Sequence, residues 1–167
     1  MIAADTSALI SLASIDLLNT FLTEFDVHTA DQVVEELEDT AAYEDRHGDA
    51  AQTVLDNLDR ITIHQLQREF TSSRVDQGEG TCALLTKEID TEFLITNNLR
   101  ALSELQTVAD ATVAISPIVL KALVQRDILE QEAALEKLDE LAEQRDWLGA
   151  PIYTKSSASS PPHRGRG

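Results

Sequence analysis

The chain has 167 residues, one cysteine, and 30 acidic against 13 basic side chains, so its formal net charge is −17. This length fits one domain with a substantial core. A single cysteine excludes an internal disulfide, and no apolar run approaches the about 20 residues of a membrane span. The N-terminal segment also lacks the positive start of a signal peptide, so we expect a cytoplasmic protein with no membrane association.

The acidic side chains are spread along the chain rather than gathered in a tail. Such a surface repels nucleic acid at low salt, because phosphate binding normally depends on Lys and Arg. Two interpretations are open: a protein that never contacts nucleic acid, or adaptation to a salty cytoplasm in which charges are screened. We favour the second interpretation, which predicts a halophilic archaeal origin.

Short apolar runs alternate with amphipathic helical segments. We predict strands at Met1–Ala4, Val27–Thr29, Ile61–Leu66, Phe93–Thr96 and Ala111–Ile115. The expected helices are Ser7–Ala13, Leu17–Phe25, Asp31–Glu38, Ala50–Leu58, Gly78–Glu88, Leu99–Ala109, Ile118–Gln125 and Ile128–Gln144. The third strand alternates apolar and polar residues, which predicts one buried face, and a polar stretch with Gly48 precedes the fourth helix. This alternation predicts an α/β fold of three layers (α/β/α), with helices on both faces of a mainly parallel sheet of about five strands.

The composition also predicts the domain organisation. We expect one domain over residues 1–147, with a core at 1–125 and a C-terminal helix at 128–144. Beyond it, residues 148–167 change to a segment rich in Ser, Pro, Gly and Arg, which predicts a disordered tail.

Polar and acidic residues follow two of the predicted strands, and in parallel α/β sheets ligands bind beyond these strand ends. Asp5 follows the first strand, Asn97 and Asn98 follow the fourth, and Glu79 opens a helix. Each has an ordinary explanation, either helix capping or a favourable interaction with the helix dipole. Together they predict a cleft in which carboxylates repel one another unless a proton or a cation intervenes. Oxygen ligands without nearby Cys or His select Mg²⁺ or Mn²⁺, which support phosphodiester hydrolysis.

Four segments, in this order, resemble the PIN domain family, which includes the VapC-type toxins. They are Asp-Thr-Ser at Asp5–Ser7, Val-Val-Glu-Glu-Leu at Val33–Leu37, Gly-Glu-Gly-Thr-Cys-Ala-Leu at Gly78–Leu84, and Leu-Ile-Thr-Asn-Asn at Leu94–Asn98. The resemblance covers residues 1–125 and implies a Mg²⁺- or Mn²⁺-dependent ribonuclease that cleaves RNA. It implies either a toxin neutralised by a small antitoxin protein or an RNA-processing enzyme, and a homodimer.

The resemblance also implies catalytic residues. Asp5 matches the first acid, Glu36 the acid of the helix, with Glu35 as the neighbouring alternative, and Glu79 the third acid. The fourth position falls on Asn98, and Asp5, Glu79 and Asn98 are the implied metal ligands.

The implied substrate contacts lie next to these positions. Thr6 or Ser7 would hold a metal-bound water or ligand, and Arg100 an RNA phosphate. Asn98 departs from the family pattern, because an amide oxygen can ligate Mg²⁺ but brings no negative charge. The sequence leaves open an active single-metal enzyme, a weak one, and a catalytically silent module that binds RNA or a protein partner.

Other chemistries lack their signatures in this chain. No glycine-rich phosphate loop and no nucleophile-elbow sequence is present, and Ser7 stands where a dehalogenase-type phosphatase needs a second Asp. The four histidines, His28, His47, His64 and His163, are scattered and predict no metal site. The basic end at residues 163–167 is either an ordinary disordered end or a tail that contacts RNA.

Overall fold

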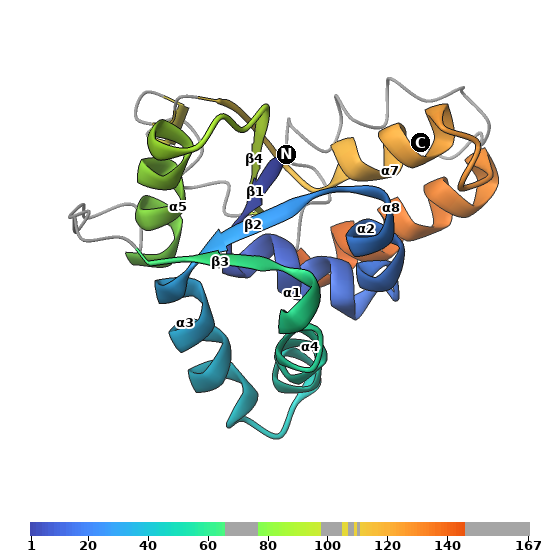
Figure 1. Ribbon diagram of the computed structural model, residues 1–167. Coiled ribbons are helices and arrows are strands. Elements are labelled where there is room, and N and C mark those ends of the chain that lie inside the picture. The colour runs from blue at the N-terminus through green and yellow to red at the C-terminus, as the bar shows by residue number, and fades with distance from the viewer. Residues whose placement is uncertain (66–76, 98–104, 107–108, 110, 146–167) are drawn as a thin grey trace. The chain divides into compact units, whose positions relative to one another are not determined.

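The computed structural model describes residues 1–65, 77–97, 105–106, 109 and 111–145, without the side chains of residues 77–81, 84 and 144–145 (Figure 1). The chain divides into two compact units, Met1–Ser116 and Pro117–Gly167. The predicted tail, and most of the helix predicted at Leu99–Ala109, lie outside the described residues.

The first unit contains a five-stranded parallel sheet. Its strands are β1 (Ile2–Ala4), β2 (Val27–Ala30), β3 (Thr62–His64), β4 (Phe93–Ile95) and β5 (Thr112–Ala114). The strand order is β3-β2-β1-β4-β5, and Ala3 lies opposite His28 on one side and Leu94 on the other. All five strands fall within or overlap the predicted segments. Because β1 is central, the residues that follow it lie in the middle of the carboxyl edge of the sheet.

Helices cover both faces of this sheet. They are α1 (Thr6–Ser14), α2 (Leu18–Glu24), α3 (Asp31–Ala41), α4 (Arg46–Leu55) and α5 (Gln77–Glu88), with the short 3₁₀-helix η1 (Leu58–Arg60) before β3. The chain moves outward from β1 to β3 and then returns across the sheet to β4. Right-handed crossovers therefore place α1 to α4 on one face and α5 on the other. Figure 1 shows α5 on the opposite side of the strands from α1 and α4, so the predicted three-layer α/β/α fold is confirmed.

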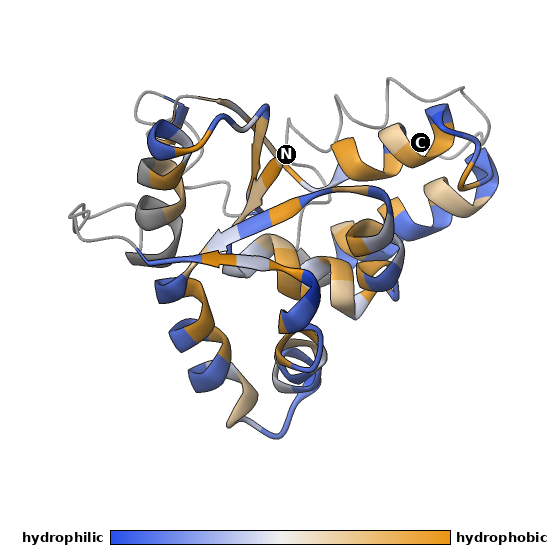
Figure 2. Cartoon of the chain, in the orientation of Figure 1, coloured by the Kyte–Doolittle hydropathy of each residue, from blue (hydrophilic) through white to orange (hydrophobic). Residues whose placement is uncertain are grey.

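The core lies between the central strands and the helices. Ile2, Ala3 and Ala4 of β1 are buried, and Leu9 and Phe21 are fully inaccessible to solvent. Figure 2 shows hydrophobic residues along one side of α3 and hydrophilic residues along the other. In the described part of the chain no single helix is long and apolar enough to cross a membrane; α1 and α2 reach that length and composition only as a pair bent by 118°.

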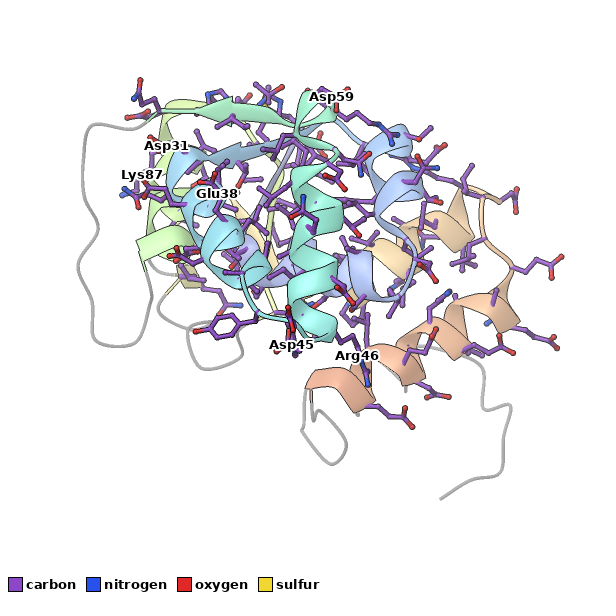
Figure 3. The ribbon with its side chains drawn as sticks, turned by 90° about the horizontal axis from the view of Figure 1, so that it is seen from below. Asp31, Glu38, Asp45, Arg46, Asp59 and Lys87 are labelled. Atoms are coloured by element: carbon purple, nitrogen blue, oxygen red, sulfur yellow. The ribbon has the colours of Figure 1, made fainter. Side chains whose placement is uncertain are left out.

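Many acidic side chains lie on the outer surface of the helical layer. Glu38 on α3, Asp45 before α4 and Asp59 in η1 are all exposed (Figure 3). Solvation of these carboxylates allows the chain to carry its large negative charge without burying it.

Helix α4 begins at Arg46, earlier than predicted, and it includes Gly48. Asp45 caps this helix, because its Oδ1 accepts a hydrogen bond from the backbone N–H of Gly48 at 2.7 Å. A Cβ at position 48 would lie 1.9 Å from the carbonyl oxygen of Tyr43. Gly48, which the sequence placed in a polar stretch before the helix, therefore allows a close backbone approach inside the first helical turn.

Strand β3 is an edge strand, and the prediction that one of its faces is buried was wrong. Successive side chains of a strand point to opposite faces, yet Thr62 and Ile63 are both exposed. Ile63 keeps 40% of its surface accessible. The alternating pattern correctly predicted a strand, but among the described strands β3 pairs with β2 alone and lies outside the well-covered centre of the sheet.

The second unit contains α7 (Pro117–Gln125) and α8 (Gln131–Arg145), which pack on each other. Helix α7 begins at Pro117, one residue before the predicted start, and proline suits this position because its missing N–H has no role in the first helical turn. Helix α8 starts three residues after the predicted Ile128, and Leu135, Leu138 and Leu141 on it are buried.

Candidate active site

Asp5 lies at the carboxyl end of the central strand and is fully buried. Its backbone N–H donates to the carbonyl oxygen of Ile95 at 3.1 Å, which ties it to the end of β4. Its Oδ1 accepts the backbone N–H of Ala8 at 3.0 Å and the hydroxyl of Ser7 at 2.8 Å. The capping explanation for Asp5 is therefore correct, and it coexists with the placement of a buried carboxylate where ligands of such sheets bind.

Glu36 of α3 reaches the residue next to Asp5. The hydroxyl of Thr6, the first residue of α1, donates a hydrogen bond to Oε1 of Glu36. Glu36 is half-buried, whereas its neighbour Glu35 is exposed. Of the two glutamates that the sequence offered, Glu36 is thus the one held beside the end of β1.

The hydroxyl of Ser7 joins the ends of β1 and β4. It donates to Asp5, accepts the backbone N–H of Asn97 at 2.9 Å, and lies 3.3 Å from Oγ1 of Thr96. Asn97 is 3% exposed, and its Oδ1 accepts the backbone N–H of Ser116 at 2.8 Å. Asn97 therefore connects the end of β4 to the segment that follows β5.

Cys82 brings α5 to the same strand end from the other face of the sheet. Its Sγ lies 3.6 Å from the carbonyl oxygen of Ala4 and 3.7 Å from Oγ1 of Thr29. Burial, together with the negative charges of Asp5 and Glu36, raises the pKa of Cys82 to about 12 against the opposing hydrogen bonds. Asp5 and Glu36 are therefore both near enough to this buried thiol for their charges to act on it.

The remaining predicted site residues are described only in part. Glu79 is in the first turn of α5, and its side chain lies outside the described atoms. Asn98 and Arg100 are outside the described residues altogether. The roles predicted for Thr6 and Ser7 in holding water or substrate stay predictions, since their hydroxyls bond to Glu36 and Asp5.

Asp31 was not among the predicted site residues. It follows β2 as Asp5 follows β1, and it is the first residue of α3, where a carboxylate is favourable. Its Oδ1 is buried and has no hydrogen-bond partner within the described part of the chain. The sequence did contain a signal for it, namely an acidic residue directly after a buried strand.

The oxygen cluster, defined as Asp5, Thr6, Ser7, Glu36 and Thr96, has the chemistry of a site for a hard cation. It offers carboxylate and hydroxyl oxygens, and Mg²⁺ and Mn²⁺ prefer such ligands. A buried carboxylate also favours a nearby cation, because burial disfavours the isolated charge. The cluster contains two carboxylates, those of Asp5 and Glu36. No group of three His, Cys, Asp or Glu side chains that could hold a metal is found among the described residues.

Comparison with known proteins agrees with this architecture. A family model of the PIN domain matches residues 1–159, so the chain belongs to the PIN domain family. PIN domains have a nuclease-like fold, typically bind nucleic acid and generally use divalent metal ions. No curated protein matches the chain.

Proposed function

We propose that this chain is a metal-dependent endoribonuclease whose catalytic residues are Asp5, Glu36, Glu79 and Asn98. The observation that carries the proposal is the convergence of two carboxylates from different elements. Asp5 is buried at the end of β1, and Glu36 reaches from α3 to the hydroxyl of the adjacent Thr6. This is the edge at which ligands of parallel α/β sheets bind.

The backbone of α5 supports a third acid at this edge. Glu79 is three residues before Cys82, and residues three apart share a helix face. The thiol of Cys82 contacts the carbonyl oxygen of Ala4, the residue before Asp5. Position 79 therefore belongs to the helix face that meets the end of β1.

The residues divide into ligands and residues that position them. Asp5, Glu79 and Asn98 would hold Mg²⁺ or Mn²⁺, which supplies a Lewis acid for a phosphoryl oxygen and lowers the pKa of bound water. The hydroxyl of Ser7 fixes one oxygen of Asp5, and the hydroxyl of Thr6 fixes one oxygen of Glu36.

The negative charge of the chain sets the conditions under which RNA can bind. With a formal charge of −17, the surface repels phosphates unless salt screens it. We expect Arg100 to contact an RNA phosphate, and cleavage to require salt far above the usual physiological concentration.

Cleavage of RNA in Mn²⁺ or Mg²⁺ at molar potassium chloride tests the proposal. The native chain would be compared with Asp5→Asn and Asn98→Asp. Metal-dependent cutting by the native chain that Asp5→Asn abolishes supports a nuclease in which an amide is tolerated at position 98. If the native chain and both folded variants are inert, the ribonuclease proposal fails.

Asn98 favours a second candidate, a silent PIN module that binds RNA or a protein partner. The amide at the fourth position removes one negative charge from the metal site and cannot accept a proton. This candidate predicts RNA binding without cleavage by the native chain and a gain of cleavage in Asn98→Asp. Filter binding and cleavage measured on the same RNA distinguish the two candidates.

We further propose that the ribonuclease acts as a toxin, and this role is tested in cells. A ribonuclease toxin arrests growth when it is expressed alone, and an antitoxin made together with it restores growth. Growth arrest by the native chain but not by Asp5→Asn supports a toxin. Normal growth, together with RNA cleavage in vitro, favours RNA processing.

A further inference from the structure

Two histidines meet between β2 and β3, away from the oxygen cluster. Nδ1 of His28 lies 2.9 Å from Nε2 of His64, and their rings stack with centroids 5.1 Å apart and planes 28° apart. His28 pairs with Thr62 and Ala30 with His64, so the two rings are diagonal neighbours on one face of the sheet. The expectation that the histidines are scattered is therefore wrong for this pair.

A carboxylate lies beside the first of these rings. Oδ1 of Asp26 lies 3.0 Å from Nε2 of His28, and the His28 side chain is 9% exposed while that of Asp26 is 63% exposed. The negative charge of Asp26 favours the His28 tautomer with hydrogen on Nε2, so that Nδ1 of His28 accepts a hydrogen bond from Nε2–H of His64. Histidines that bind metals commonly have a carboxylate beside the second ring nitrogen; Asp26 lies at that distance from Nε2, but the two atoms do not have the geometry of a hydrogen bond.

We propose that Nδ1 of His28 and Nε2 of His64 bind one Zn²⁺ ion, with Asp26 as the carboxylate beside His28. In a tetrahedral zinc site with Zn–N distances of about 2.0–2.1 Å, two nitrogens lie about 3.3 Å apart. The two nitrogens are 2.9 Å apart, so they need to separate by about 0.4 Å to admit the ion. A small rotation of the half-buried His64 ring, on the edge strand, would provide this distance, and the proton on Nε2 of His64 would move to Nδ1 of the same ring so that Nε2 can bind the ion.

The chemistry of this pair differs from that of the oxygen cluster. Imidazole nitrogens suit zinc and other late first-row metals, whereas Mg²⁺ requires oxygen ligands. No third His, Cys, Asp or Glu side chain of the described residues completes a protein-only site, so water fills the other coordination positions. The inference does not depend on the proposed ribonuclease function, since none of these three residues belongs to the oxygen cluster.

Zinc titration of the full chain, made without a polyhistidine tag, tests the inference. Isothermal titration calorimetry with ZnCl₂ would be run in excess Mg²⁺, so that oxygen sites are occupied. The variants are His64→Gln and Asp26→Asn, and the matched controls are His47→Gln, in the first turn of α4, and His163→Gln. His64→Gln is used in place of His28→Gln, because His28 is buried and its loss would also disturb the sheet.

We expect the native chain to bind one Zn²⁺ and His64→Gln to bind it at least about tenfold more weakly. Asp26→Asn should weaken binding by about tenfold, the lower end of the effect of losing an outer-shell partner. Both control variants should bind as the native chain does. Absence of zinc binding by the native chain overturns the inference, and so does equal affinity of the native chain and His64→Gln.

Discussion

The oxygen cluster and the histidine pair belong to one parallel sheet but differ in ligand chemistry and in position. The cluster lies at the end of the central strand, where Asp5 is fully buried and the hydroxyl of Ser7 donates to its Oδ1. The histidine pair lies between β2 and the edge strand β3, and its outer member, His64, is only half-buried. The centre of the sheet thus places oxygen atoms together, and its edge places imidazole nitrogens together.

Both regions disfavour further charge of the kind already present. Burial and the carboxylates of Asp5 and Glu36 raise the pKa of Cys82, which disfavours its thiolate. Burial and the neighbouring His28 lower the pKa of His64, which disfavours its protonated form, although Glu88 opposes this effect. Each region therefore has a titratable group whose behaviour reports on it, Cys82 beside the oxygen cluster and His64 within the histidine pair.

The largest expected effect concerns the thiol beside the oxygen cluster. A pKa raised from 9.0 to about 12 lowers the thiolate fraction of Cys82 at pH 8 by about 1000-fold. Labelling by a thiol reagent such as DTNB should therefore be slower by about that factor in the folded chain than in urea. Since the unfolded thiol ionises first, stability should be lost as the pH rises above 9. Labelling of the folded chain at the rate measured in urea would contradict the burial of Cys82 beside the oxygen cluster.

Glutamate substitutions separate the two neighbouring acids of α3. Glu36→Gln should lower the single-turnover rate of RNA cleavage by more than the about 10–100-fold typical of outer-shell residues, because Glu36 is held at the site. Glu35→Gln is the matched control, because Glu35 is exposed on the same helix and loses the same charge. Equal loss in both variants would mean that charge alone, rather than position, determines activity.

Ser7→Ala tests how firmly the ends of β1 and β4 are joined. The variant leaves the backbone N–H of Asn97 without its acceptor, which should lower the free energy of unfolding by about 1–3 kcal/mol. Urea denaturation measures this loss. Ser14→Ala, whose hydroxyl bonds to the carbonyl oxygen of Ser11 within one helix, should change stability less. A smaller loss in Ser7→Ala than in Ser14→Ala would contradict the link.

The smallest expected effect concerns acid sensitivity at the histidine pair. The folded pKa of His64 lies below the ordinary value of 6.5, so the unfolded chain binds this proton more readily. Stability from His64 is therefore present above pH 6.5 and is lost as the pH falls through the lower folded pKa. Urea denaturation in EDTA at pH 7 and pH 5 should show a smaller loss in His64→Gln than in the native chain. An equal loss would assign the acid sensitivity to other groups.

The sheet was predictable from the sequence because each strand is a short apolar run that ends in polar residues. The features that were missed depend on neighbours distant in the chain. Burial of Thr62 and Ile63 depends on whether β3 is central or at an edge, and the run itself looks the same in both cases. The start of α4 depends on the approach of Gly48 to the Tyr43 carbonyl, which a glycine in isolation does not indicate.

The candidate site was predictable to a similar extent. Asp5 stands directly after a strand, so its place at the carboxyl edge followed from the strand itself. The sequence could not show which of Glu35 and Glu36 faces the site, because adjacent residues of a helix point in different directions around its axis. The hydrogen bond between Thr6 and Glu36 identifies Glu36 as that residue. The pairing of His28 with His64 depends on strand order and register across 36 residues, which local patterns do not contain.

The approach of Gly48 to Tyr43 also limits how this chain can diverge during evolution. Any side chain at position 48 would force the Tyr43 carbonyl aside, whatever its polarity or size. A lineage that keeps the length of the connection between α3 and α4 is therefore expected to keep this glycine. Replacement of the glycine should be accompanied by an insertion or deletion in the same connection.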